Sequence, residues 1–359
     1  MLSQWIILAE YVIKIKDRKG KKNMVKLFKA KTANELWKQA AKKLINTPTQ
    51  QESRQGLTRE YLHCSLHLEN PQQRWITSRQ PAINPAFAIA EVIWILQGSD
   101  DANFINFWNP KLPEYSGKGR KYHGAYGARL RKHFTIDQLN FAYDALRQNE
   151  ASRQVVLQIW DSSCDFPIWK GKPNNEDIPC NIASMLKIRS SKLEWSQIMR
   201  SNDLYRGTPH NIIQFTSLQE IIAGWLQVQL GSFTLFTDSL HFYEKDIKEV
   251  QIIDSNIPIN SDSLMFSKTE FDEFFPIVFD YLDKLRSIEL NRNNFIKLTH
   301  IKEIPRPWKN LLCIVAADAV RRKGWYDEME YIVEQCNNSI LLISWQNWLN
   351  RQNSKRKIK

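Results

Sequence analysis

Alternating apolar and polar positions predict four strands in the middle of the chain. Residues 182–189 and 192–200 alternate well enough to form a hairpin that turns at Ser190 and Ser191. The runs "RQVVLQIW" (153–160) and "SFTLFTDSLHFY" (232–243) predict two further strands. Residues 1–30 have the pattern of one or two more strands around the basic turn "KDRKGKKN".

Apolar positions at helical spacing predict helices on both sides of these strands. The first begins near Thr32, whose hydroxyl can cap "ANELWKQAAKKLI". A strongly apolar helix over 85–97 is interrupted only by Glu91, a costly place for a carboxylate. The remaining helices are expected at 136–148, 211–230, 271–287, 308–323 and 325–351.

Polar and glycine-rich segments separate these elements. Residues 45–61 read as a loop, and residues 103–131 read as a long functional loop because they combine Gly and Pro with many aromatics. The pattern predicts an α+β fold with a mixed or mostly antiparallel sheet, flanking helices and extra C-terminal helices. With Pro305 and Pro307 as a junction, we divide the chain into an N-terminal extension (1–30), a central domain (31–305) and a C-terminal helical extension (306–359).

The composition of the 359 residues, 43% of them hydrophobic, is that of a soluble globular protein. We expect no contact with a membrane, because no apolar run reaches the roughly 18 residues that span a bilayer. The five cysteines are odd in number, widely spaced and without a CxxC pair. They indicate free thiols in a reducing, cytoplasmic compartment and no metal site.

A net charge of +12 suits a polyanionic partner, either nucleic acid or phosphorylated small molecules. Lys and Arg are scattered along the chain, and only the tail "SKRKIK" is a basic run, which reads best as a solvated end.

One stretch combines a thiol with a cation. Cys180 follows Pro179 at the start of a predicted strand, and pairing through the Ser190 turn sets Arg200 roughly opposite it. A nearby cation favours the thiolate that nucleophilic chemistry needs. A lone cysteine is otherwise more often a small buried hydrophobe.

Five motifs follow one another from Pro179 to Tyr243: Pro-Cys-Asn (179–181), Arg-Ser-Asn-Asp (200–203), Gly-Thr-Pro-His-Asn-Ile (207–212), a long apolar helix and His-Phe-Tyr (241–243). This order resembles the signature of the thymidylate synthase family, which reads Pro-Cys-His, Arg-Ser-x-Asp, Gly-x-Pro-x-Asn-Ile, helix and His-x-Tyr. Upstream, "AEVIWILQGSDDANF", "HGAYGARLR", "SRQVVLQIW" and "SRQG" are similar to further family segments, so the resemblance covers roughly residues 30–250.

The resemblance implies a homodimeric enzyme that moves one carbon from 5,10-methylenetetrahydrofolate to C5 of a pyrimidine nucleoside monophosphate. Cys180 would attack C6 of the ring, with Arg200 stabilising the thiolate and contacting the phosphate. Glu91 and Tyr126 would organise water and move protons. The central domain would then be the catalytic domain.

The same resemblance implies ligands for the rest of the substrates. Phosphate and sugar would be held by Arg54, Arg153, Ser201, His241 and Tyr243, with Arg153 lent by the partner subunit. The folate would be bound by Asp203 and Trp108.

Asn211 bears on the identity of the base. Its amide can donate to O4 and accept from N3–H of uracil, whereas a carboxylate there would suit cytosine. An asparagine that caps the following helix is an alternative reading.

The chain departs from the family at several points. Asn181 replaces a histidine, Gln154 replaces a second arginine, and the C-terminal helices replace a short tail that closes over the folate. Imperfect closure would let water capture the one-carbon intermediate, so a hydroxymethylase acting on dUMP, UMP, dCMP or CMP is an alternative. Another is an inactive nucleotide- or RNA-binding homologue. Retention of Cys180, Arg200, Asp203 and Asn211 together speaks against it, because a pure binder has no need of the thiol, and we do not expect nucleic acid as a partner.

Overall fold

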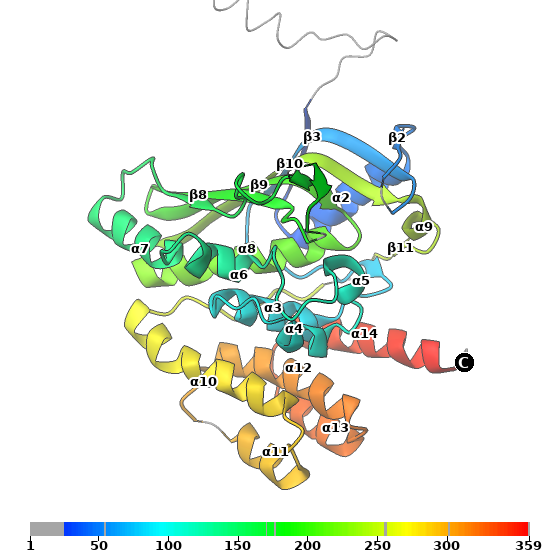
Figure 1. Ribbon diagram of the computed structural model, residues 1–359. Helices are drawn as coiled ribbons and strands as arrows, with labels where there is room; N and C mark the ends of the chain where they lie inside the picture. Colours follow the sequence, from blue (N-terminus) through cyan, green and yellow to red (C-terminus); the bar gives the residue numbers. More distant parts are fainter. Residues whose placement is uncertain are drawn as a thin grey trace, which may run out of the picture.

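The computed structural model of the chain (Figure 1) describes residues 25–53, 55–169, 171–175, 177–254, 257–300 and 302–357. The strands predicted before residue 25 and the candidate ligand Arg54 lie outside these ranges. None of the described helices combines the length and the apolar character needed to cross a membrane.

A mixed seven-stranded sheet forms the upper layer in Figure 1, in the order β1–β3–β10–β9–β8–β5, with β2 beside β3. The pairs β1–β3 and β10–β9 are parallel, and the others are antiparallel. This confirms the predicted α+β fold with a mixed sheet. The strands are β1 (Lys26–Ala30), β2 (Gln50–Gln51), β3 (Thr58–Leu68), β5 (Val156–Gln158), β8 (Asn181–Arg189), β9 (Lys192–Asp203) and β10 (Gln229–Tyr243). Two small ribbons add β4 (Arg79–Gln80) with β11 (Gln251–Ile252), and β6 (Ile168–Trp169) with β7 (Lys172–Pro173).

Three helices lie against the lower face of the sheet: α2 (Ala33–Ile45), α7 (Gln138–Gln148) and α8 (Gly207–Leu226). As predicted, Thr32 caps α2, its hydroxyl accepting a hydrogen bond from the Glu35 N–H at 3.2 Å. Helix α8 is buried on nearly every side because it lies between the sheet and α3 (Pro85–Leu96). Its nearly continuous apolar sequence is what such a position requires.

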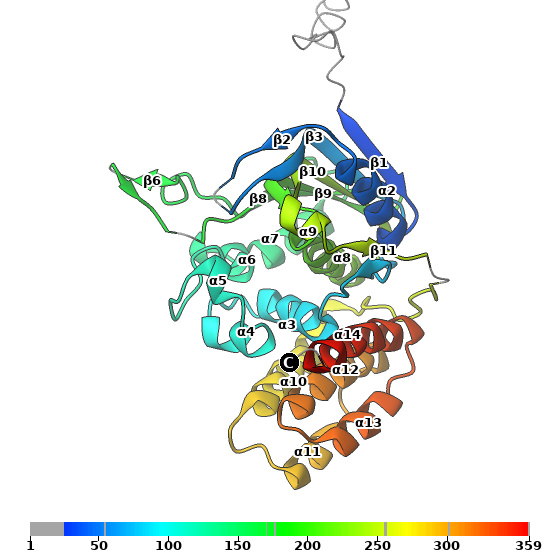
Figure 2. The same cartoon turned by 90° about the vertical axis from the view of Figure 1, so that its right-hand side faces the viewer.

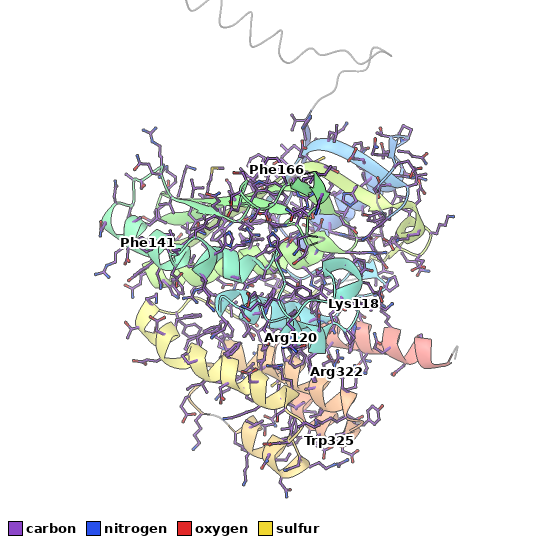
Figure 3. All side chains as sticks on the ribbon, in the orientation of Figure 1. Lys118, Arg120, Phe141, Phe166, Arg322 and Trp325 are labelled. Atoms are coloured by element: carbon purple, nitrogen blue, oxygen red, sulfur yellow. The ribbon has the colours of Figure 1, made fainter. Side chains whose placement is uncertain are left out.

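The C-terminal helices continue the same core rather than forming a separate one. Figure 2 shows α12 (Arg306–Arg322) and α14 (Ser339–Lys357) beneath α3, and all three share one buried cluster with the sheet layer. In Figure 3, Arg322 reaches from α12 toward α4 (Ala102–Trp108), where it donates to the Trp108 carbonyl oxygen at 3.0 Å. The remaining helices are α5 (Pro113–Ser116), α6 (Tyr126–Ala128), the π-helical turn η1 (Arg129–His133), α9 (Glu244–Ile247), α10 (Lys268–Arg286), α11 (Arg292–Thr299) and α13 (Tyr326–Glu334).

Three local predictions were wrong. Residues 58–61, predicted as loop, begin β3, because pairing with β10 engages a polar segment that lacks strand alternation. Most of the loop predicted over 103–131 consists of the short helices α4, α5, α6 and η1. The single helix predicted over 325–351 is split where the Asn338 side chain accepts from the N–H groups of Ile340 and Leu341, at 3.2 and 3.3 Å, and so starts α14.

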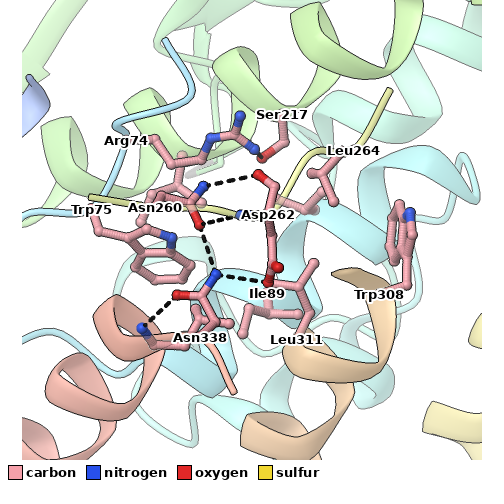
Figure 4. Close-up of a pocket in the computed structure, with 13 residues that line it drawn as sticks. Arg74, Trp75, Ile89, Ser217, Asn260, Asp262, Leu264, Trp308, Leu311 and Asn338 are labelled. Atoms are coloured by element: carbon pink, nitrogen blue, oxygen red, sulfur yellow. Dashed lines mark hydrogen bonds between the residues drawn. The ribbon is translucent and has the colours of Figure 1, made fainter. Parts of the chain in front are cut away.

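A small cavity of about 20 Å³ lies between α3, α8 and the C-terminal helices (Figure 4). Asn338 crosses its edge, donating to the side-chain oxygens of Asn260 at 2.8 Å and Asp262 at 2.7 Å. The cavity volume is about what one water molecule needs. It is therefore too small for a nucleotide, and its polar lining serves to fix the C-terminal helices to the preceding loop.

Candidate active site

Cys180 lies where the chain enters β8, opposite Arg200 on β9. The register pairs Asn181 with Met199, and the Arg200 N–H donates to the Cys180 carbonyl oxygen at 3.0 Å. The hairpin turns at Ser190 and Ser191 as predicted, with φ of 49° and 58°. Strand pairing thus sets the thiol beside the guanidinium.

The Arg200 guanidinium is fixed by the backbone that leads to the thiol. Its Nε donates to the Pro179 carbonyl oxygen and its Nη2 to that of Ile178, both at 3.0 Å. Nη2 also lies 3.8 Å from Cys180 Sγ. This geometry holds a positive charge against the sulfur and favours its ionised form.

The other four cysteines are poor nucleophiles by comparison. Burial raises the pKa of Cys64 and of Cys313 to about 12, and that of Cys336 to about 11. Burial also raises the pKa of Cys164. A thiol with a raised pKa is almost wholly protonated near neutral pH, so Cys180 is the best candidate nucleophile.

Tyr126 lies beside the thiol in the helical layer. Its phenol hydrogen-bonds the Asn181 side chain, and the charges of Cys180 and Glu91 both act on it. Burial raises the pKa of Tyr126 well above its usual range, and the neighbouring Cys180 adds to the effect. The phenol therefore keeps its proton and can act as a hydrogen-bond donor in the site.

Asn211 belongs to a chain of buried amides. It donates to Asn202 Oδ1 at 3.3 Å and accepts from Asn181 Nδ2 at 3.5 Å, while Gln197 donates to Asn181 Oδ1 at 2.9 Å. Among the described residues, Asn202 Nδ2 is buried without a hydrogen-bond partner. The alternative in which Asn211 caps the helix is wrong, because it lies inside α8 and Arg206 is the residue at the N-cap position.

Asp203 ends β9 and supports the turn into α8. Its Oδ1 accepts from the N–H groups of Tyr205 and Arg206, at 2.8 and 3.0 Å, and burial raises its pKa. Beside this turn lies an open pocket of about 510 Å³ that Arg206 and Tyr115 help to line. Arg206 crosses the pocket, donating to the Tyr115 hydroxyl at 2.9 Å and to Asp246 Oδ1 at 2.8 Å.

His241 and Tyr243 are two residues apart at the end of β10. Their ring centroids lie 5.3 Å apart, and the two rings are perpendicular. The Tyr243 phenol hydrogen-bonds Ser53, so the described part of the 51–56 loop reaches the site. Ser201 lies on the adjacent strand, paired with Ser239.

Two predicted ligands are not brought to the site within one chain. Arg153 is exposed in the segment before β5, away from the Cys180 cluster. Trp108 is 1% exposed and packs in the core, so the structure gives it no surface to offer a folate. The resemblance matched Trp108 to a folate-side tryptophan of the family across a segment of different length, and here its ring is used for packing instead.

A cluster of possible metal ligands lies outside this site. His123, Cys164 and Asp165 have ligand atoms within 4.8 Å of one another. The Arg129 guanidinium occupies their midst, donating to Asp165 at 2.8 and 3.1 Å. A guanidinium in that position already neutralises the carboxylate and repels a cation.

Comparison with known proteins identifies the family. The family model described as thymidylate synthase matches residues 35–289, which is most of the chain. The chain belongs to the thymidylate synthase family. The suspected resemblance is thereby confirmed.

Several curated relatives of this family are similar to the chain. A deoxyuridylate hydroxymethyltransferase of Bacillus phage SP01 is 35% identical over 193 residues, or 50% of this chain and 49% of the relative. One of Pseudomonas phage M6 is 32% identical and covers 50% of each protein. A putative thymidylate synthase of Methanothermobacter marburgensis is 28% identical over 62% of this chain and 95% of the relative. The chain thus spans about half the length of the hydroxymethyltransferases it matches.

Two residues near the thiol were not among the predicted ligands. His210 and Asn202 stand at the variable positions of the family motifs Gly-x-Pro-x-Asn-Ile and Arg-Ser-x-Asp. A family motif says nothing about the residue at a variable position. The only signal in the sequence was that His210 and Asn202 are polar and adjoin motif residues. His210 Nδ1 lies 2.9 Å from Glu91 Oε2.

Proposed function

We propose that the protein transfers one carbon from 5,10-methylenetetrahydrofolate to C5 of a uracil nucleoside monophosphate through a Cys180 adduct at C6. The observation that carries this proposal is the contact between Cys180 and Arg200, whose guanidinium is anchored to the backbone on both sides of Pro179. The catalytic unit is residues 31–305, with 306–359 as a helical extension and 1–30 as an N-terminal extension.

C5 of the intact ring is a poor nucleophile, and Cys180 activates it. When the thiolate adds to C6, the ring electrons move toward O4, and C5 becomes a nucleophile that can take up the one-carbon unit. The C5 proton must then leave, and the C6–S bond breaks when the product forms. The proton-bearing Tyr126 phenol and Glu91 face the same space and are suited to move protons around O4 and C5.

The nucleotide phosphate needs several cations. Arg200 Nη1 makes no hydrogen bond to the described residues, so it is available to a phosphate oxygen while the rest of the guanidinium holds Cys180. Ser201, His241 and Tyr243 lie at the adjoining strand ends and would bind phosphate and sugar. Arg54 would complete the set.

We propose a homodimer in which Arg153 of one subunit reaches the phosphate bound by the other. The face of the sheet turned away from α2 and α8 exposes large apolar side chains: Phe236 is 44% exposed, Leu62 is 53% exposed and Leu27 is 65% exposed. Such a face is suited to a second sheet. Two sheets packed there would bring the exposed Arg153 of one subunit toward the phosphate of the other.

Asn211 supports uracil as the base. An amide can rotate to donate to O4 and accept from N3–H, exchanging its contacts with Asn181 and Asn202 for contacts with the base. The deoxyuridylate hydroxymethyltransferases among the relatives act, by their names, on a uracil nucleotide. This favours dUMP over dCMP as the substrate.

The folate would lie in the open pocket beside Asp203. Its volume of about 510 Å³ is in the range of small-molecule sites. One Asp203 oxygen is engaged by backbone N–H groups, and the other is 4.0 Å from Arg206 Nε, so a donor of the pterin would share Oδ2 with that guanidinium. The folate supplies the one-carbon unit as a co-substrate, and a reducing, cytoplasmic compartment would keep the thiol active.

The product can be methyl or hydroxymethyl. The hydroxymethyl alternative is favoured by the names of the relatives. A binding protein without catalysis is the third possibility.

Tritium release from C5-labelled dUMP, UMP, dCMP and CMP, with and without methylenetetrahydrofolate, tests the proposal. Folate-dependent release from a uracil nucleotide is expected, with Cys180→Ala abolishing release while retaining nucleotide binding. Absence of release from all four nucleotides by a folded dimer would refute the enzyme and leave the binding protein. A monomer in light scattering would contradict the shared site.

A further inference from the structure

His210 and Glu91 form a pair in the active site that the family motifs do not specify. His210 Nδ1 lies 2.9 Å from Glu91 Oε2, and the two side chains are 16% and 15% exposed. The contact is close but is not aligned as a hydrogen bond, because neither atom has a hydrogen-bond partner among the described residues.

The pair joins two helices on the helical side of the thiol. His210 comes from the first turn of α8, one residue before Asn211, and Glu91 comes from the middle of α3. Phe87, one turn before Glu91, packs against the His210 ring with centroids 4.9 Å apart. The ring is thereby held from one side while its nitrogen holds one oxygen of the carboxylate.

We propose that His210 is a positioning residue that fixes the Glu91 carboxylate so that its second oxygen activates water for 5-hydroxymethyl formation. This inference rests on the proposed function and deepens it, since it assigns the product as well as a residue. With Oε2 against His210, the carboxylate cannot rotate freely, and no hydrogen bond engages Oε1 among the described residues. The Glu91 charge also acts on the Tyr126 phenol, which is next to Cys180.

The step balances without an oxidant or a reductant. The substrate at this point carries an exocyclic methylene at C5 and the Cys180 sulfur at C6. The water oxygen bonds to the methylene carbon, the electron pair of that double bond moves through C5 to O4, and a water proton passes to Glu91. The O4 electrons then return, C5=C6 forms, and the C6–S bond breaks to release the Cys180 thiolate.

Two substitutions separate positioning from packing. In His210→Phe the ring contact with Phe87 is kept and the nitrogen is lost. In His210→Asn the ring is lost, but the amide Nδ2 stands the same number of bonds from the backbone as Nδ1 and can still donate. His300→Phe makes the same change at an exposed residue that ends α11, and serves as the matched control.

The experiment follows tritium release from C5-labelled dUMP and, in the same reaction, the ratio of 5-hydroxymethyl to methyl product. The wild type and His300→Phe are expected to form mainly the hydroxymethyl product. His210→Phe is expected to lower the hydroxymethyl yield per tritium released about 10-fold, the scale of a weak acid–base contribution, and His210→Asn to restore most of it.

Three results would overturn the inference. The first is a wild type that forms only the methyl product, which would leave the proposed function intact because tritium is still released. The second is the reverse order of the variants, with His210→Phe normal and His210→Asn impaired, because that order marks a packing role. The third is absence of tritium release from the wild type, which would refute the proposed function together with the inference.

Discussion

The reactivity of Cys180 depends on the charge that Arg200 holds against it. Arg200→Met keeps an unbranched, flexible stem of similar width and removes the charge that lies 3.8 Å from the sulfur. At that separation, an effective dielectric constant between that of water and that of a protein surface gives about 1–4 kcal/mol of stabilisation for the thiolate. Since 1.4 kcal/mol is a factor of about ten, the thiolate population falls roughly 5-fold or more.

Arg200→Lys distinguishes charge from geometry. The lysine keeps a positive charge but cannot donate to the carbonyl oxygens of Pro179 and Ile178 through two separate nitrogens. Each lost hydrogen bond from a charged group costs about 1.5–3 kcal/mol. We therefore expect Arg200→Lys to retain more thiol reactivity than Arg200→Met, and to lose catalysis because the turn at Pro179 is less firmly held.

The assay is alkylation by iodoacetamide at neutral pH, read by mass spectrometry of the peptide that contains Cys180. The other four cysteines act as internal references, because burial raises their pKa values and keeps them protonated. Arg189→Met, at the exposed far end of β8, is the matched control. The reasoning is refuted if Cys180 reacts no faster than Cys164, or if Arg200→Met reacts as fast as the wild type.

Three further predictions concern proton transfer, the buried core and the hairpin. Tyr126→Phe lowers the rate of tritium release about 10-fold. Since the raised pKa of Tyr126 keeps the phenol protonated, the loss of rate is the same at every pH from roughly 6 to 9. A loss of rate confined to high pH would contradict this prediction. Glu220→Gln unpairs the buried Arg74 guanidinium and lowers the free energy of unfolding in urea by about 3–5 kcal/mol; a change below about 1 kcal/mol would show that the charge is solvated. The double substitution Ser190→Asn with Ser191→Gly raises the free energy of unfolding by about 1 kcal/mol, because both serines have positive φ and Asn and Gly tolerate that conformation better. No gain would mean that the turn carries little strain.

The catalytic hairpin could be predicted from sequence because its information is local. Apolar alternation indicates which residues face the core, and the turn at Ser190 and Ser191 sets the register as far as Ala183 and Ile198. A bulge between Asn181 and Ala183, which the pattern does not indicate, then shifts the pairing by one residue and brings Cys180 to Arg200. The cap of α2 at Thr32 is equally local. Such features depend on neighbours within a few residues, so one sequence is enough to find them.

Contacts between distant segments could not be predicted in the same way. Nothing near Trp108 in the sequence indicates that α12 will cover it, and only that packing turns a possible ligand into a core residue. The polar start of β3 is a strand because β10 supplies its hydrogen bonds. The ends of α13 and α14 depend on Asn338, whose side chain can either continue a helix or cap one.

Residues that the family motifs leave variable, and one that departs from them, meet in space although they are scattered in sequence. Asn181 and Asn202 each contact Asn211, and His210, one residue earlier in α8, holds Glu91. The motif positions themselves supply the thiol, the guanidinium and the amide that any C5 transfer requires. The variable positions then decide how the amide is oriented and which oxygen of the carboxylate meets water. Changes at these variable positions are therefore expected to alter base choice and product more than formation of the Cys180 adduct.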